Sequence, residues 1–159
     1  MLPGSPAGIE DMAEIIKQHF VVSADDFAAA GAAAAAVKKT LTQLGFPADV
    51  IRRVSIAMYE GEINMVIHAG GGEALAEITA DFIKITLTDN GPGIPDVGLA
   101  MKKGWSTATD SIRELGFGAG MGLPNIEKYS DDLQIETEVG KGTTLIITIY
   151  TEVGSENFG

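Results

Sequence analysis

The sequence predicts an α+β protein, a two-layer α/β sandwich in which helices and β-hairpins share one mixed sheet. Two observations lead to this prediction. Long segments between residues 25 and 69 have the composition or the apolar spacing of helices, and several short segments are rich in β-branched residues and bounded by turn residues. The chain has 159 residues, of which 45% are hydrophobic, and this is enough to bury one core without disulfides or metals.

The first elements follow from local composition. Residues 15–23, IIKQHFVVS, predict a strand because β-branched and aromatic side chains are frequent there. Ser23 or Asp25 offers an N-cap for a helix over residues 25–44, whose many alanines have the highest helix propensity. Gly45 is a natural end for this helix.

A second helix is predicted from Pro47 to about Ala69, because apolar residues recur there at helical spacing. The glycines at 70–72 end it. Two strands then follow, at residues 74–80 and 82–88, and they form a hairpin.

The C-terminal half alternates irregular and regular segments. Glycines and prolines in DNGPGIP, residues 89–95, prevent regular structure, and the polar, glycine-rich stretch 104–122 has the composition of a mobile lid. The remaining predicted elements are a short helix at 96–103, a helix at about 121–129, and strands near 133–138 and 143–151. We therefore expect a flexible leader over residues 1–12, a single domain over 13–152 and a tail over 153–159.

Composition restricts the partners and the location. No cysteine is present, which excludes disulfides and thiolate metal sites. The opening residues MLPGSPAG have no basic start followed by an apolar run, so we expect no signal peptide. No segment approaches the roughly 20 apolar residues that cross a bilayer, so we expect a cytoplasmic protein. The net charge of −11 argues against nucleic-acid or membrane partners, and a bound nucleotide should arrive with a divalent metal.

Glu60 and Asn64 form the first candidate cluster. They lie four residues apart on the second predicted helix and therefore on the same face. A carboxylate there can accept a proton, and an amide oxygen is a hard ligand that suits Mg²⁺. A solvated polar stripe would also explain this spacing.

The second cluster follows the predicted hairpin. Asp89 can accept a hydrogen bond from an exocyclic amine such as that of adenine, and Gly91 and Gly93 allow the backbone to approach a flat ring. A simple turn, for which these residue types are also preferred, is the alternative.

Glycines also dominate two later motifs. Gly118, Gly120 and Gly122 alternate before a helix, so that backbone N–H groups and the helix N-terminus can face phosphate oxygens. The segment Gly140 to Thr144, GKGTT, enters the last strand, and its hydroxyls can support a ligand or Asp89. A flexible loop and an ordinary β-turn explain the same residues.

In this order, ExxxN, DxGxG, GxGxGLP and GKGTT resemble the signature of the GHKL ATPases, whose adenine site is the Bergerat fold. The resemblance runs from about Lys17 to Tyr150 and implies a mainly antiparallel sheet covered on one face by helices. Within GHKL proteins, HAGGGE and MGLPNIEKYSDD look like the stressosome switch serine kinases, relatives of the anti-sigma-factor serine kinases.

The resemblance assigns roles by residue. Glu60 would be the base, Asn64 the Mg²⁺ ligand and Asp89 the group that binds the adenine amine. Either Lys102 or Lys103 would reach a phosphate, and we take Lys103 as the candidate. The other residues implied in nucleotide binding are Gly91, Gly93, Ile94, Gly118, Gly120, Met121, Gly122, Leu123 and Thr144.

The resemblance implies an Mg-ATP-dependent serine/threonine protein kinase that phosphorylates a small partner of the STAS type. An alternative is a nucleotide-loaded regulator that holds a sigma factor or a phosphatase without essential kinase activity. A third is a catalytic fragment serving a separate histidine-bearing protein. The resemblance also allows a homodimer. The insert 108–115 departs from the compact lid of the switch kinases, and His68 is expected to be structural.

Overall fold

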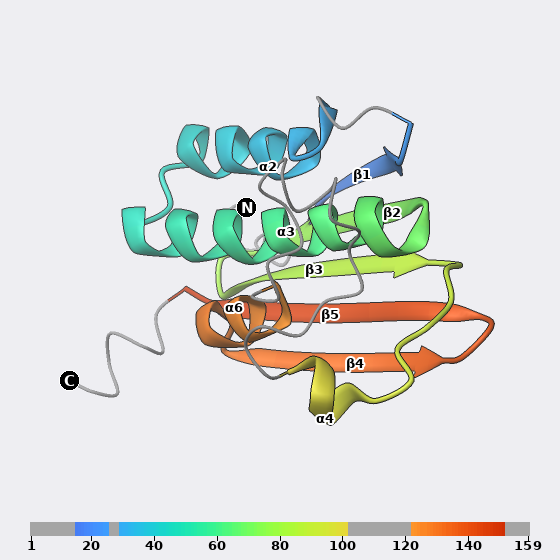
Figure 1. The fold of residues 1–159 in the computed structure, drawn as a ribbon. Coiled ribbons are helices and arrows are strands. Elements are labelled where there is room, and N and C mark those ends of the chain that lie inside the picture. Colours follow the sequence, from blue (N-terminus) through green and yellow to red (C-terminus); the bar gives the residue numbers. More distant parts are fainter. Residues whose placement is uncertain (1–14, 26–28, 102–121, 152–159) are drawn as a thin grey trace.

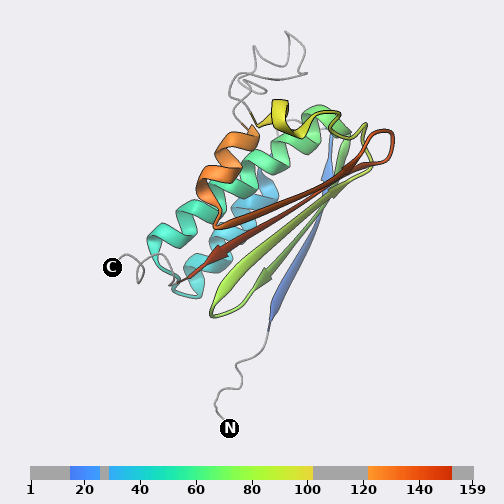
Figure 2. The same ribbon diagram turned by 90° about the horizontal axis from the view of Figure 1, so that it is seen from below.

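The computed structural model describes residues 15–25, 29–101 and 122–151. In this part of the chain, helices cover one face of a single sheet, which confirms the predicted two-layer α+β architecture (Figures 1 and 2). The elements are β1 (Ile16–Ser23), α2 (Ala32–Gln43), α3 (Ala48–Ala69), β2 (Gly71–Ile78), β3 (Phe82–Asp89), α4 (Val97–Ala100), α6 (Gly122–Tyr129), β4 (Asp132–Glu138) and β5 (Gly142–Tyr150).

The sheet has five strands in the order β1-β2-β3-β5-β4. Every neighbouring pair among these strands is antiparallel, so the described sheet has none of the parallel pairing that a mixed sheet would contain. The strand β5 is the last in sequence, yet it lies between β3 and β4. Asp89, at the end of β3, is paired with Thr143 of β5, and this register brings two of the sequence motifs together.

The core lies between the sheet and the helices. Alternate residues of the central strands face the helices and are buried, as in Ile83, Ile85 and Leu87 of β3. In Figure 1, α3 lies across the sheet with α2 on one side and α6 on the other. Gly61 allows α3 to lie close to β3, because a Cβ atom at this position would collide with Leu87.

The boundaries of α3 agree with the prediction. Pro47 is its N-cap, and Gly70 is its C-cap in the left-handed conformation, with φ 76°. The following strand differs from the prediction, because β2 begins at Gly71 and not at residue 74. A Cβ atom at Gly71 would collide with the carbonyl oxygen of Val22, and one at Gly72 with that of Thr88. The two glycines therefore belong to the sheet, where neighbouring backbones approach closely.

The predicted start of the first helix is wrong. Ser23 is the last residue of β1, and α2 begins at Ala32 with Gly31 at the N-cap, in the left-handed conformation and without a local side-chain cap. The capping group is Glu62 of α3, a residue that is only 2% exposed. Its carboxylate accepts hydrogen bonds from the backbone N–H groups of Gly31, Ala33 and Ala34 at 2.9, 3.2 and 3.0 Å. A group on another helix thus satisfies the unpaired donors at the start of α2.

The short helix α4 is also smaller than the predicted 96–103. Its N-cap is Asp96, whose side chain accepts a hydrogen bond from the N–H of Leu99 at 3.0 Å.

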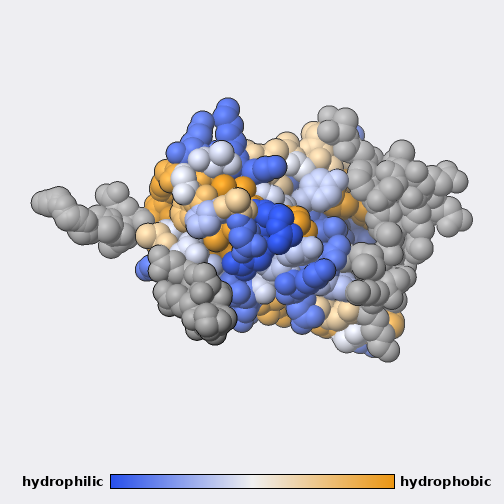
Figure 3. All heavy atoms as spheres, turned by 90° about the vertical axis from the view of Figure 1, so that its left-hand side faces the viewer, coloured by the Kyte–Doolittle hydropathy of each residue, from blue (hydrophilic) through white to orange (hydrophobic). Residues whose placement is uncertain are grey.

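Figure 3 shows the end of the molecule at which α3 begins, where hydrophilic surface is interspersed with smaller hydrophobic areas. At the start of α3, Arg53 pairs with Asp49 at 3.0 Å and with Asp131 at 3.1 Å. None of the helices in the described ranges is both long enough and apolar enough to span a bilayer.

Candidate functional site

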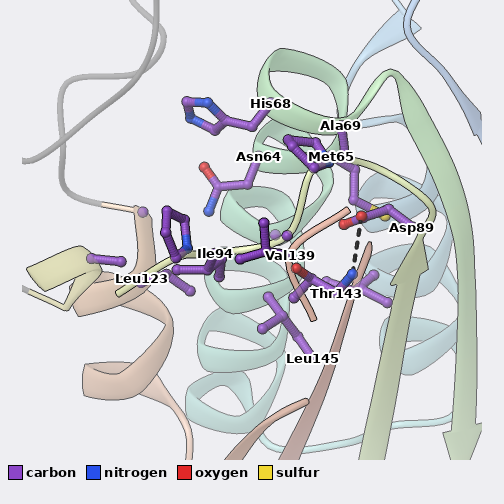
Figure 4. A pocket seen from close by; sticks show the side chains of 17 residues that line it. Asn64, Met65, His68, Ala69, Asp89, Ile94, Leu123, Val139, Thr143 and Leu145 are labelled. Atoms are coloured by element: carbon purple, nitrogen blue, oxygen red, sulfur yellow. Dashed lines mark hydrogen bonds between the residues drawn. The ribbon is translucent and has the colours of Figure 1, made fainter. Parts of the chain in front are cut away.

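A cavity of about 390 Å³ lies between α3, the segment after β3, the start of α6 and the β4–β5 hairpin (Figure 4). This volume is in the range of small-molecule sites. Its walls are mainly apolar, with side chains that include Met65, Leu87, Ile94, Leu123, Val139 and Leu145. The polar side chains in the lining are Asn64, His68, Asp89 and Thr143. The site is thus a mainly apolar cavity with a few polar groups in its walls.

Asp89 is held in a defined orientation. Its Oδ1 accepts hydrogen bonds from the backbone N–H of Gly91 at 2.9 Å and of Thr143 at 3.2 Å, the second of which is drawn in Figure 4. Its Oδ2 accepts no hydrogen bond from any residue in the described ranges. One oxygen is therefore fixed by the protein, and the other can accept a hydrogen bond from the amine of a ligand.

The structure gives a reason for glycine at positions 91 and 93 that the sequence did not reveal. A Cβ atom at Gly91 would lie 2.6 Å from the Cβ of Ala69, at the end of α3. At Gly93, where φ is 81°, it would lie 2.9 Å from the Cα of Val139. Gly93 lines the cavity and Gly91 does not. Both glycines allow close packing of protein on protein, whether or not a ring binds.

Hydrogen bonds tie the segment after β3 to the β4–β5 hairpin. The N–H of Gly140 donates to the carbonyl of Pro92 at 2.9 Å, and the N–H of Ile94 donates to Oγ1 of Thr137 at 2.9 Å. Two segments far apart in the sequence therefore form one wall of the cavity.

The structure brings Thr143, and not the predicted Thr144, to the cavity. Successive residues of β5 alternate between the two faces of the sheet, and Thr143 is on the buried face. Thr144 is next to it and lies on the face that the helices leave uncovered (Figure 2). The GKGTT motif identified the strand entrance but not which threonine faces the site.

Glu60 and Asn64 lie one turn apart on α3, as predicted, but they differ in position. Asn64 lines the cavity, and Gly122 lies against it, since a Cβ atom at Gly122 would be 2.7 Å from Nδ2 of Asn64. Glu60 is not part of the cavity lining. Its Oε2 accepts a hydrogen bond from Nδ2 of Asn125, on α6, at 3.2 Å.

The glycine-rich motif is only partly described. Gly122 and Leu123, at the start of α6, line the cavity, and Leu123 is buried. Lys103, the alternative Lys102, Gly118, Gly120, Met121 and the insert 108–115 lie outside the described residues.

Sequence reasoning missed other residues of the site. Met65, Val139 and Leu145 line the cavity, but as apolar residues they carried no signal beyond that of a core. His68, expected to be structural, also lines it, and burial lowers the pKa of its imidazole below the ordinary value of 6.5. His68 follows Asn64 by one helical turn, and this spacing was the available clue.

Comparison with known proteins supports the resemblance of the motifs. The family described as the histidine kinase-like ATPase domain matches residues 23–149, which is most of the chain. The chain belongs to this family. Two similar proteins are named as a protein kinase and as an anti-sigma factor. The serine/threonine-protein kinase RsbT of Bacillus subtilis is 33% identical over 107 residues, which cover 65% of this chain and 74% of RsbT.

An anti-sigma F factor of Clostridium beijerinckii is 31% identical over 118 residues, or 70% of this chain and 79% of that protein. Among solved structures, the crystal structure of the RsbU and RsbW domains of a Mycobacterium tuberculosis protein has a TM-score of 0.57 at 18% identity. The match covers 84% of this chain and 32% of that chain, so the present ATPase domain spans about a third of the solved chain. This likeness supports the fold.

Proposed function

We propose that this protein is an Mg-ATP-dependent serine/threonine protein kinase of the anti-sigma regulatory type, acting in the cytoplasm on a small STAS-like partner. The observation that carries the proposal is the Asp89 carboxylate, with Oδ1 bound by two backbone N–H groups and Oδ2 available, at the wall of an apolar cavity that Asn64 also lines. The match to the histidine kinase-like ATPase family and the similarity to RsbT give it further support.

Asp89 and the apolar walls would bind adenine. Oδ2 of Asp89 would accept a hydrogen bond from the exocyclic amine, and an ionised acceptor makes such a bond stronger than a neutral one. Met65, Ile94 and Leu145 would pack against the ring, because burial of a flat apolar surface favours binding. Thr143 would act through its backbone N–H by holding Asp89 in place.

Asn64 would hold Mg²⁺ through its side-chain oxygen. The described residues contain no cluster of three or more histidine, aspartate and glutamate side chains that could bind a metal. Mg²⁺ is commonly bound by one or two protein oxygens together with phosphate oxygens and water, so a single amide fits this ion. When bound, the ion neutralises phosphate charge. We propose that Lys103 and the backbone of Gly118, Gly120 and Gly122 bind the phosphates.

Glu60 would serve as the base. The partner's hydroxyl oxygen forms a bond to the γ-phosphorus of ATP while the bond to the leaving ADP breaks, and Glu60 accepts the hydroxyl proton. Positioning and charge neutralisation supply most of the rate in such transfers.

A nucleotide-loaded regulator, holding a sigma factor or a phosphatase without essential kinase activity, is the second candidate. The similarity to anti-sigma F factors favours it. A homodimer is compatible with either function.

The first test is calorimetric titration of ATP and ADP, with and without Mg²⁺, into wild type and Asp89→Asn. In the variant, Oδ1 can still accept both backbone N–H groups, so Nδ2 would face the adenine amine, donor against donor. We expect metal-dependent binding that weakens at least about 10-fold in the variant, roughly 1.4 kcal/mol or more. Asp132→Asn, an exposed residue at the start of β4, is the matched control and should bind normally.

The second test is transfer of labelled phosphate from Mg-ATP to a panel of purified STAS-domain proteins from the source organism. Glu60→Gln should abolish transfer and retain nucleotide, whereas Glu127→Gln, an exposed site on α6, should have no effect. Nucleotide binding without transfer to any of the panel would favour the regulator. Absence of nucleotide binding by wild type would refute both functions.

A further inference from the structure

A hydrogen bond joins the proposed base to a helix that the proposed mechanism does not otherwise use. Asn125 of α6 donates from Nδ2 to Oε2 of Glu60 on α3, at 3.2 Å and in a partly buried environment. The two residues are 65 positions apart. We propose that Asn125 is a positioning residue, which fixes the Glu60 carboxylate through Oε2 and leaves Oε1 to accept the proton of the substrate hydroxyl. The proposal rests on the kinase function proposed above.

Packing between α3 and α6 holds this bond in register. Ile126, the neighbour of Asn125, is fully buried, and its Cδ1 would lie 3.8 Å from a Cβ atom at Gly61, the neighbour of Glu60. One helical turn away, Gly122 lies against Asn64, where a Cβ atom would be 2.7 Å from Nδ2. The contact at Gly122 needs glycine, because a Cβ atom there would be too close to Asn64, whereas the contact between Ile126 and position 61 is an ordinary van der Waals contact. The two contacts bring the two helices together at the level of Glu60 and Asn64, so the amide of Asn125 cannot shift away from the carboxylate without disturbing buried contacts.

A hydrogen bond from the Asn125 amide is suited to hold Glu60 as a base. An amide N–H can donate to a carboxylate without carrying a charge, so it orients the ion without the strong pairing that a lysine or arginine would give. A carboxylate held at one oxygen presents the other in a fixed direction, and the rate of proton transfer depends on this geometry. Asn64 is one turn further along α3 on the same face, so the held carboxylate lies beside the proposed metal ligand.

Asn125→Ala and Asn125→Asp test the assignment. Turnover is measured as phosphate release from Mg-ATP and as transfer to the STAS-domain protein that wild type phosphorylates, and the Kd of Mg-ATP is measured by calorimetry. We expect kcat to fall about 10- to 100-fold in Asn125→Ala, with the Kd of Mg-ATP within about twofold of wild type. Asn125→Asp should be slower still, because it places a carboxylate without a donor against Glu60. Glu127→Ala, an exposed site on the same helix, is the control.

A double variant tests whether the hydrogen bond stabilises the fold while activity still requires the carboxylate at position 60. Combining Glu60→Gln with Asn125→Asp exchanges donor and acceptor and restores the hydrogen bond. We expect it to regain the melting temperature lost in Asn125→Asp and to remain inactive, since no carboxylate stands at position 60. Recovery of turnover in this double variant would overturn the proposal.

Two further outcomes would also overturn it. In the first, wild type is active and Asn125→Ala has the same kcat; this result would overturn the role of Asn125 but leave the kinase function intact. The second is a parallel loss of kcat, nucleotide affinity and melting temperature in Asn125→Ala, which would mark a structural contact. A wild type that binds Mg-ATP but shows no turnover with water or any partner would refute the kinase function itself, and the role of Asn125 with it.

Discussion

Replacing Glu62 with alanine should destabilise the protein more than any other single carboxylate change on α3. Glu62 is 2% exposed and accepts three backbone N–H groups at the start of α2, at 2.9, 3.2 and 3.0 Å. A hydrogen bond to a charged acceptor contributes roughly 1.5–3 kcal/mol, and the carboxylate also lies at the positive end of the helix dipole. The three bonds share one acceptor group and therefore add incompletely.

We expect Glu62→Ala to lower the free energy of unfolding by about 3–5 kcal/mol, which corresponds to roughly 10–15 °C in Tm for a domain of this size. Urea unfolding followed by circular dichroism measures this loss. Glu62→Gln retains the shape and turns one oxygen into a donor that faces a backbone N–H, so it should lose about 1–3 kcal/mol.

Glu60→Ala is the matched control for this experiment. It lies two positions away on the same helix, and its described hydrogen bond is the one from Asn125. We expect it to lose less than about 1 kcal/mol of stability while it loses activity, the reverse of Glu62→Ala. A loss below about 1 kcal/mol in Glu62→Ala, or one no larger than in Glu60→Ala, would show that the three bonds do not stabilise α2 as argued.

Two more predictions concern packing and pH. Gly61→Ala should lower the free energy of unfolding in urea by about 1–3 kcal/mol, because the new methyl group collides with Leu87. The control Gly98→Ala meets nothing closer than 3.4 Å and should change this free energy little. Equal losses in the two variants would contradict the reasoning. Burial lowers the pKa of His68 in the folded protein, so the unfolded chain takes up this proton first as the pH falls. The stability that neutral His68 provides is complete above the unfolded pKa of about 6.5 and is lost as the pH falls towards the lowered folded pKa. Tm measured from pH 8 to pH 5 should therefore fall less in His68→Asn, and an identical slope would refute this assignment.

Elements with local signals were predictable from the sequence. Pro47 and Gly70 bound α3 because the conformational preferences of proline and glycine act at the residue itself. The start of α2 was not predictable in this way. The local candidates Ser23 and Asp25 have the right chemistry for a cap, but the group that caps α2 is Glu62, which comes from another helix.

The motifs that form the site were predictable from the sequence, but the individual side chains that face the cavity were less so. Asp89 and Asn64 meet at one cavity because their motifs end a strand and occupy a helix face in the way the spacing indicates. The choice between Thr143 and Thr144 depends on strand register, which two identical neighbouring residues cannot reveal. Asn125 carried no signal, because its contact with Glu60 exists only once α3 and α6 are packed.

The place of β5 in the sheet has a consequence for biosynthesis. During translation β3 and Asp89 leave the ribosome well before β5, which lies between β3 and β4 in the finished sheet. Until it does, Oδ1 of Asp89 lacks the N–H of Thr143, and the segment after β3 lacks the hairpin that closes its side of the cavity. Nascent chains that end before residue 143 should thus be unable to form the cavity, so the proposed nucleotide ligand would bind only chains whose sheet is complete.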